Sequence, residues 1–251
     1  MGFPPSHYCC FLCVIVLLPV LCKGENTFTY SLATYYGSAD GLGTPTGACG
    51  FGEYGRSVNG GNVAAVSRLY RDGTGCGACY QVRCNMPNLC ADDGIEVVVT
   101  DQGGGDNTAF ILSKRGFSML ALPNRAADLI PYGMVGIEYR RVPCHYPDSN
   151  IFFKVHEHSR FPDYLAIVIL YQAGLSDITS VNIWKEDSQA WRCMGNSHGA
   201  VWDMSNPPKG PVSLRLQVSR GGGQKWVQLM NVIPGDWKAG VAYDSLFQLD
   251  Y

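Results

Sequence analysis

The cysteines between residues 76 and 90 constrain this chain most strongly. Cys76, Cys79 and Cys84 lie within nine residues, and Cys90 follows six positions later. This spacing suits a zinc cluster, a redox dithiol or part of a disulfide framework. Because these arrangements belong to different compartments, the destination of the chain decides among them.

The N-terminus indicates secretion. Residues 8–21 form a nearly continuous apolar run, shorter than the roughly 20 residues that a membrane-spanning helix needs, and small or polar residues follow it. Residues 1–24 are therefore predicted to be a secretory signal peptide, although no Lys or Arg precedes the apolar run. We expect the mature protein to be soluble and extracellular, with no membrane partner after cleavage.

An oxidising compartment favours the disulfide interpretation. Four of the 11 cysteines lie in the predicted signal peptide, and six of the other seven precede residue 145. This distribution predicts three disulfides in an N-terminal domain and leaves Cys193 without a disulfide partner. The six cysteines allow 15 pairings, and their spacing does not choose among them.

The metal and redox alternatives are weaker. Cys84 and Cys90 are too widely spaced for the usual second zinc knuckle, and no histidine lies near them. No thioredoxin-like helix pattern follows Cys79, which disfavours a catalytic dithiol. We therefore expect no metal and no cofactor.

Composition narrows the class of ligand. The formal net charge is −2, only 16% of residues are charged, and neither half of the chain is polarised. Nucleic acids and anionic membranes are disfavoured as partners because both require clustered Lys and Arg. With 30 Gly, 14 Tyr and 5 Trp, the chain has the composition of a secreted β-protein with aromatic surface. We expect a monomer that binds a neutral ligand.

Residues 25–147 have an all-β pattern. Short β-rich segments alternate with glycine-rich turns, and strands are predicted at residues 28–32, 80–83, 95–100 and 134–141. Residues 96–100 are apolar on both faces, as in a closed barrel. Helical periodicity is confined to brief stretches such as residues 113–121, where Phe117, Leu120 and Ala121 could form one face.

Residues 148–251 form a second predicted domain. Two prolines bracket residues 143–147, and the cysteine framework ends there. Beyond this point, strands are predicted at residues 151–155, 164–171, 178–184, 200–204, 212–218 and 226–232, with turns at 195–196 and 221–223. Closely spaced strands without a long helix indicate a β-sandwich.

Five motifs resemble the plant expansin superfamily across essentially the whole predicted mature chain. They are Ala33-Thr34-Tyr35-Tyr36-Gly37, Gly47-Ala48-Cys49-Gly50, residues 75–84, Val99-Thr100-Asp101 and residues 138–144. The resemblance implies a six-stranded double-psi β-barrel related to family-45 endoglucanases, followed by an immunoglobulin-like β-sandwich that binds polysaccharide. It also implies the disulfide pairing: Cys49 with Cys76, Cys79 with Cys144, and Cys84 with Cys90.

Departures from the family pattern bear on catalysis. Expansins carry a His-Phe-Asp motif whose aspartate matches the general acid of the related endoglucanases; here those positions are Ala109-Phe110-Ile111. A second family aspartate is replaced within residues 44–46. Glycoside hydrolysis ordinarily needs two carboxyl groups. The pattern resembles the expansin-like B subgroup, and Ile111 in place of Asp predicts a protein that is not an enzyme.

The resemblance and the residue chemistry together suggest binding residues, because sugar rings stack on aromatic side chains and hydroxyls bond polar ones. Tyr35 takes the position of a family cleft tryptophan, Tyr164 matches a platform tyrosine, and His198 replaces the platform tryptophan. The alternatives are core packing for the aromatic residues and loop hydrogen bonding for Asp101. The predicted residues are Thr34, Tyr35, Tyr36 and Asp101 in the barrel, and Tyr164, His198 and Trp202 in the sandwich.

These features predict a secreted, non-hydrolytic protein that binds plant cell-wall polysaccharide, and the resemblance raises wall loosening as an activity. Two alternatives stay open: a weak endoglucanase using Asp101 with Asp106, and a secreted signalling protein that binds a receptor through its barrel. His156 and His158 lie at i and i+2 and are predicted to form a solvated strand face with Lys154 rather than a metal pair.

Overall fold

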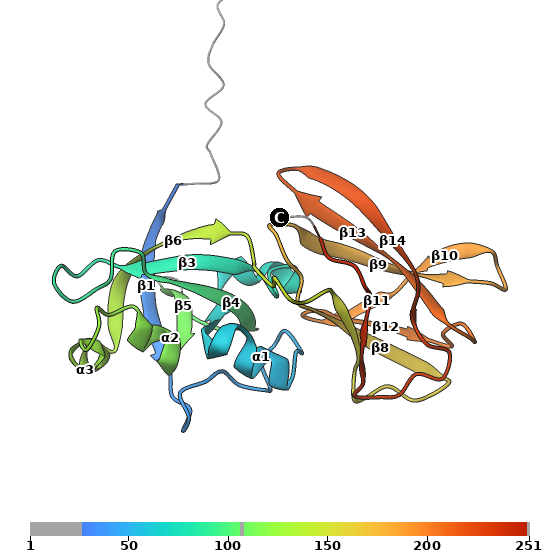
Figure 1. Cartoon of the computed structure of the whole chain (residues 1–251), viewed down its shortest axis with the longest axis horizontal. Helices are drawn as coiled ribbons and strands as arrows, with labels where there is room; N and C mark the ends of the chain where they lie inside the picture. Colours follow the sequence, from blue (N-terminus) through green and yellow to red (C-terminus); the bar gives the residue numbers. More distant parts are fainter. Residues whose placement is uncertain (1–26, 106–107, 250–251) are drawn as a thin grey trace, which may run out of the picture.

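The computed structural model describes residues 27–105 and 108–249, which form two β-rich domains lying side by side (Figure 1). The predicted signal peptide and Asp106 lie outside the described residues. Among the described residues, no helix combines the length and the apolar character that crossing a membrane requires.

The N-terminal domain is a closed six-stranded barrel with the strand order β1-β5-β2-β4-β3-β6. Strand β1 pairs in parallel with β5, as β2 does with β4. This confirms the predicted barrel. Its strands are β1 (Thr29–Tyr36), β2 (Val63–Val66), β3 (Cys79–Cys84), β4 (Ile95–Gln102), β5 (Thr108–Ser113) and β6 (Met134–Val142).

Two barrel strands were not predicted from the sequence. Strand β2 is only four residues long and buried on both faces, so it shows no alternation, and β5 lies between a glycine-rich loop and a helix. The predicted helical stretch is confirmed by α2 (Lys114–Met119), whose Phe117 is fully buried. Ser113 caps this helix because its Oγ accepts from Gly116 N over 3.0 Å.

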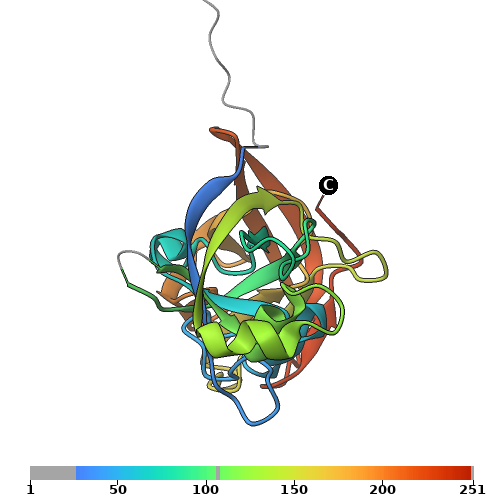
Figure 2. The same ribbon diagram turned by 90° about the vertical axis from the view of Figure 1, so that its left-hand side faces the viewer.

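The remaining helices of the described residues are short and belong to the barrel domain. Viewed from the barrel end, α2 and α3 lie in front of the strands, and the paired strands β1 and β6 rise above them (Figure 2). These remaining helices are α1 (Glu53–Ser57), α3 (Ala126–Leu129) and the 3₁₀ helices η1 (Val58–Gly61), η2 (Arg68–Gly73) and η3 (Ile130–Tyr132).

Three disulfides join the cysteines that the resemblance paired: Cys49–Cys76, Cys79–Cys144 and Cys84–Cys90. The Cys79–Cys144 bridge spans 65 residues and ties β3 to the segment that follows β6. In the chain-entropy model a loop of this length contributes about 4 kcal/mol to stability. Cys193 is a free, exposed thiol.

The C-terminal domain is a β-sandwich, as predicted. A four-stranded sheet has the order β10-β9-β13-β14, and a five-stranded sheet has the order β11-β12-β8-β7-β15. The strands are β7 (Phe152–Val155), β8 (Tyr164–Leu170), β9 (Asp177–Lys185), β10 (Ala190–Cys193), β11 (Gly195–His198), β12 (Val201–Ser205), β13 (Val212–Arg220), β14 (Gly223–Ile233) and β15 (Ala242–Asp244).

Two local predictions for the sandwich are wrong. Gly195 and Asn196, predicted as a turn, begin the edge strand β11, which pairs with β12. Strand β7 ends at Val155, so His156 and His158 follow the strand instead of lying on its face. Edge strands and strand ends are set by pairing partners, which a single segment does not reveal.

The outer face of the five-stranded sheet packs on the barrel. Strand β8 is buried on both sides: Leu165 and Ile167 belong to the sandwich core, whereas Ala166, Val168 and Leu170 belong to the same apolar cluster as the barrel interior. The linker runs from residue 143 to 151, between β6 and β7, and the predicted domain boundary after residue 147 falls within it.

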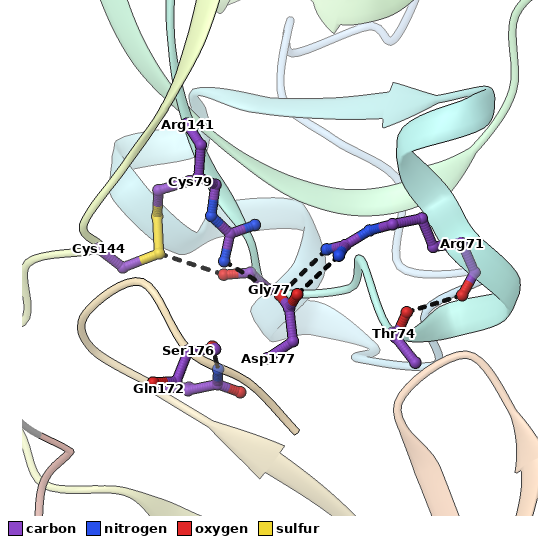
Figure 3. A network of polar contacts seen from close by, with 9 residues as sticks. All are labelled: Arg71, Thr74, Gly77, Cys79, Arg141, Cys144, Gln172, Ser176 and Asp177. Atoms are coloured by element: carbon purple, nitrogen blue, oxygen red, sulfur yellow. Dashed lines mark hydrogen bonds and ion pairs between the residues drawn. A yellow bond between two sulfur atoms is a disulfide. The ribbon is translucent and has the colours of Figure 1, made fainter. Parts of the chain in front are cut away.

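An ion-pair network and backbone pairing hold the two domains together. Asp177, at the start of β9, lies between two barrel arginines: Arg71 Nη1 donates to it over 2.6 Å and Arg141 Nη2 over 3.2 Å (Figure 3). Cys144 and Gly174 exchange two backbone hydrogen bonds of 3.0 Å each. Since charged side chains and backbone groups both form hydrogen bonds across the junction, we infer a fixed orientation of the two domains.

Candidate functional site

Asp101 lies on β4 at the mouth of the barrel, where it holds a loop. Its Oδ1 accepts from Ala48 N over 2.6 Å and from Gln102 N over 2.8 Å. A Cβ at Gly47 would lie 2.6 Å from the Thr100 carbonyl oxygen, so only glycine allows the loop to approach this closely. Of the two roles considered for Asp101, loop hydrogen bonding and sugar binding, the structure therefore shows the first.

Two tyrosines lie beside Asp101. Burial first, and the Asp101 charge second, raise the pKa of both Tyr36 and Tyr70 above the ordinary value. The Tyr70 hydroxyl donates to the Ala48 carbonyl over 3.2 Å, whereas the buried Tyr36 hydroxyl has no hydrogen-bond partner among the described residues. Tyr36 thus keeps its proton, which has no acceptor among the described residues.

Thr34 and Tyr35 are engaged elsewhere. The Thr34 hydroxyl donates to the Gly133 carbonyl over 2.7 Å, and the Tyr35 hydroxyl donates to the Ile130 carbonyl over 3.3 Å. The Tyr35 ring packs against Phe117, with 4.7 Å between ring centroids. Alternation along β1 explains the packing of Tyr35, because residue 35 shares the face of buried Ala33. Of the four predicted barrel residues, only Tyr36 and Asp101 are brought together.

The structure places the residues at which the family resemblance implied that acids are replaced. Ile111 on β5 lies opposite Thr34 on β1, and it contacts the loop after Asp101, 3.2 Å from the place of a Gly103 Cβ. Thr44 and Thr46 share a hydrogen bond of 2.9 Å between their hydroxyls. Asp40, which lines a hollow of about 350 Å³ beside Tyr36, is ion-paired with Arg56.

In the sandwich, Tyr164 and His198 lie at the margin of the covered sheet face. The half-buried Tyr164 donates its hydroxyl to Asp203 Oδ2 over 2.7 Å, and this hydrogen bond, followed by burial, raises the pKa of Tyr164. His198 is exposed, and its Nε2 lies 3.0 Å from the place of a Cβ on Gly50 of the barrel. This imidazole therefore borders both domains.

Trp202 does not belong to this surface. It is 8% exposed and lies in the sandwich core. The sequence argument assumed one regular strand from His198 to Trp202, but β11 ends at His198 and β12 begins at Val201. Trp202 therefore faces the same side as its cross-strand partner Ile167, which is fully buried. We exclude Trp202 from the binding residues.

Two further histidines, His156 and His158, lie close to His198. The sequence did not predict this grouping. The His156 ring lies 4.7 Å from that of His158 and 6.4 Å from that of His198. Burial is the first cause of the lowered pKa of His156. The His-Glu-His pattern was visible in the sequence, but its approach to β11 depends on sheet pairing. No group of three or more His, Cys, Asp or Glu in the described chain could hold a metal ion.

The loop of residues 47–50 connects the two halves of the site. Its Ala48 bonds Asp101, while Cys49 accepts a backbone hydrogen bond of 3.0 Å from Ala200 of the sandwich. Tyr36 and Asp101 thus lie on one side of the loop and His198 on the other. The arrangement places one carboxylate and one exposed imidazole on either side of the same loop, and such polar groups can bond the hydroxyls of a ligand.

Comparisons with known proteins identify both domains. A family model for the Expansin C-terminal domain matches residues 151–234, and the DPBB_1 model, described as Lytic transglycolase, matches residues 62–136. The chain is 50% identical to Expansin-like B1 of Arabidopsis thaliana over 94% of both chains. It is 44% identical to Expansin-like B1 of Oryza sativa subsp. japonica over 94% of this chain and 93% of that relative.

A solved structure shares the fold. The apo expansin of Clavibacter michiganensis superposes with a TM-score of 0.66 at 19% identity, covering 88% of this chain and 98% of that one. A mutant of the same bacterial protein matches equally well and was solved in complex with cellohexaose. Together with the family models and the plant relatives, these matches show that the chain belongs to the plant expansin superfamily, in its expansin-like B subgroup.

Proposed function

We propose that this protein is secreted and binds cell-wall polysaccharide without hydrolysing it, along a surface that runs from Tyr36 and Asp101 over the 47–50 loop to His198 and Tyr164. The observation that carries the proposal is the loop itself, which contacts Asp101 on one side and the sandwich on the other. A glycan chain along this surface would meet groups of both domains.

The chemistry of the barrel mouth argues against cleavage. A hydrolase needs a proton donor and a second carboxylate across the scissile bond. By the family resemblance, the position of the proton donor corresponds to Ile111, whose side chain is a hydrocarbon, and Asp101 already accepts two backbone hydrogen bonds. Both features favour binding over catalysis.

The sandwich supports the same function. Tyr164 presents a ring whose hydroxyl is fixed by Asp203, so little side-chain entropy is lost when a sugar stacks on it. The bacterial relative bound to cellohexaose supports a β-glucan as one ligand class for this chain. The apolar N-terminal run supports secretion.

Binding of the mature protein to insoluble cellulose, xylan, xyloglucan and pectin, measured by depletion from solution, tests this proposal. We expect retention on at least one neutral glycan, reduced in Tyr164→Ala. A creep assay on heat-inactivated wall strips then asks whether binding is accompanied by loosening. Tight binding to a protein receptor with no retention on any wall fraction would contradict the proposal and favour a signalling role.

A further inference from the structure

The outer face of the β10-β9-β13-β14 sheet carries aromatic side chains that the proposed site does not use. Trp191 and Trp184 lie directly opposite each other on β10 and β9, with 5.4 Å between ring centroids. Trp226, on the edge strand β14, is 41% exposed. The Arg215 guanidinium carbon lies 5.1 Å from the Trp191 ring centroid and 4.4 Å from that of Trp226.

These planar groups form a row across the sheet. Each of the four strands contributes one, and four strands at the usual spacing cover about 14 Å. Arg215 lies between two tryptophan rings, and a guanidinium over an aromatic face is an attractive contact. This contact restrains both rings, so the row is preorganised.

Strand register shows that the row faces outward. Leu214 and Leu216 are fully buried in the sandwich core, so Arg215 between them points to the opposite side. Gln217 lies opposite Trp226 in the same ladder. The neighbouring side chains on this face are mainly amides and hydroxyls, with the Cys193 thiol 3.6 Å from the Ser180 hydroxyl. The amides and hydroxyls are Ser180, Asn182, Ser213, Gln217, Gln224 and Gln228.

The chemistry of this face selects a ligand class. Exposed tryptophan faces stack on the C–H faces of sugar rings, and the neighbouring amides can bond hydroxyl groups. Arg215 carries the one positive charge among these four groups, and Glu186 Oε1 accepts from Trp184 Nε1 over 2.9 Å, so an acidic ligand would meet no cluster of positive charge. Nucleic acid requires clustered basic groups, and a tight protein partner usually meets a more apolar centre.

We propose that the row of Trp184, Trp191, Arg215 and Trp226 is a second polysaccharide-binding surface, specific for a neutral glycan chain. It lies on the opposite side of the sandwich from the barrel-side surface, because the two surfaces belong to the outer faces of different sheets. This inference rests on the proposed function only in that the ligand belongs to the same wall glycans. One molecule with both surfaces bridges two glycan chains.

A bridging assay separates the two surfaces. Suspended cellulose nanocrystals are mixed with the full mature protein, and aggregation is followed by light scattering while binding is measured by depletion. We expect Trp226→Ala to abolish most of the aggregation and to weaken total binding, whereas the matched Met230→Ala, which removes an exposed side chain from the same strand, changes neither. Trp226→Tyr keeps a ring and should restore aggregation.

A soluble probe measures the second surface alone. In a Tyr164→Ala background, cellohexaose binding followed by tryptophan fluorescence should weaken about tenfold on adding Trp226→Ala. Thermal unfolding verifies that each variant is folded, which we expect because Trp226 is exposed.

The outcomes distinguish this inference from the proposed function. If wild-type protein binds cellulose but Trp226→Ala binds and bridges equally well, the second surface does not exist and the proposed function stands. If Tyr164→Ala has no effect while Trp226→Ala removes all binding, the second surface stands and the barrel-side surface is wrong. Capture of a protein ligand through the tryptophans, with no glycan bound, would overturn the inference.

Discussion

The two outer faces of the sandwich differ in what covers them. On the five-stranded sheet, β8 presents Ala166, Val168 and Leu170 outward, and the barrel buries them. On the four-stranded sheet, β13 presents Arg215 and Gln217 outward, and no described element buries them. The outer faces of the two sheets therefore differ in side-chain composition. The face that the barrel covers is apolar, whereas the uncovered face combines amides with aromatic rings.

This difference has a functional consequence. Where the barrel covers the sheet, the proposed surface is limited to the margin with Tyr164 and His198, and His198 lies next to Gly50 of the 47–50 loop. Where the sheet is free, the whole face can take part. The barrel thus contributes shape and a fixed orientation to the first surface, and the second surface needs the sandwich alone.

The largest expected effect comes from placing a charge on the covered face. Val168→Asp puts a carboxylate at a position that is 1% exposed, and it should lower the free energy of unfolding by about 4 kcal/mol. The matched change on the free face, Gln217→Asp, should stay within about 0.5 kcal/mol. Urea unfolding of both variants measures the difference, and equal destabilisation would show that both faces are buried.

Removing the interdomain carboxylate should have the next largest effect. Asp177→Ala leaves Arg141, whose side chain is 20% exposed, without its ion pair, and should cost about 2 kcal/mol. Asp128→Ala breaks an exposed pair with Arg125 and should cost less than about 0.5 kcal/mol. If thermal unfolding of Asp177→Ala matches that of Asp128→Ala, the network does not hold the barrel on the sheet.

At the uncovered margin, the expected effect is on binding. Tyr164→Ala should weaken retention on the preferred wall glycan about tenfold, which corresponds to the loss of one stacked ring. Tyr164→Phe should retain most of the affinity because stacking uses the ring. Tyr132→Ala, which removes an exposed tyrosine from the barrel, is the control. Equal loss in the phenylalanine variant would assign the affinity to the hydroxyl instead.

The smallest effect concerns pH. Because the folded state lowers the pKa of His156, the unfolded chain binds more protons as the pH falls below about 6.5, and stability decreases there. His156→Gln should therefore lose less unfolding free energy than the wild type between pH 7.5 and 5, as measured by urea unfolding at each pH. If the free energy of unfolding changes with pH equally in both proteins, the lowered pKa of His156 does not contribute to stability. The charged or titratable neighbours are Lys154, Glu157, His158 and His198.

Features set by local sequence patterns could be predicted, whereas features set by the pairing of distant strands could not. The all-β class and the sandwich were predictable because strand patterns are local, whereas the six-stranded barrel and the disulfide pairing came from the family resemblance. The burial of Trp202 was not, since it follows from the turn between β11 and β12. The approach of His156, after β7, to His198, on β11, requires three successive strand pairings, because β8 and β12 lie between these strands. The tryptophan row likewise combines side chains from four strands, which composition indicated only as aromatic surface.

Release of reducing ends from soluble β-glucan tests most directly whether this protein binds without cleaving. The measurement compares the wild-type protein with Asp101→Asn under conditions in which both are shown to bind the glucan. We predict that neither releases reducing ends above the background of glucan alone. Release by the wild type that is lost in Asp101→Asn would contradict the account and establish Asp101 as a catalytic residue.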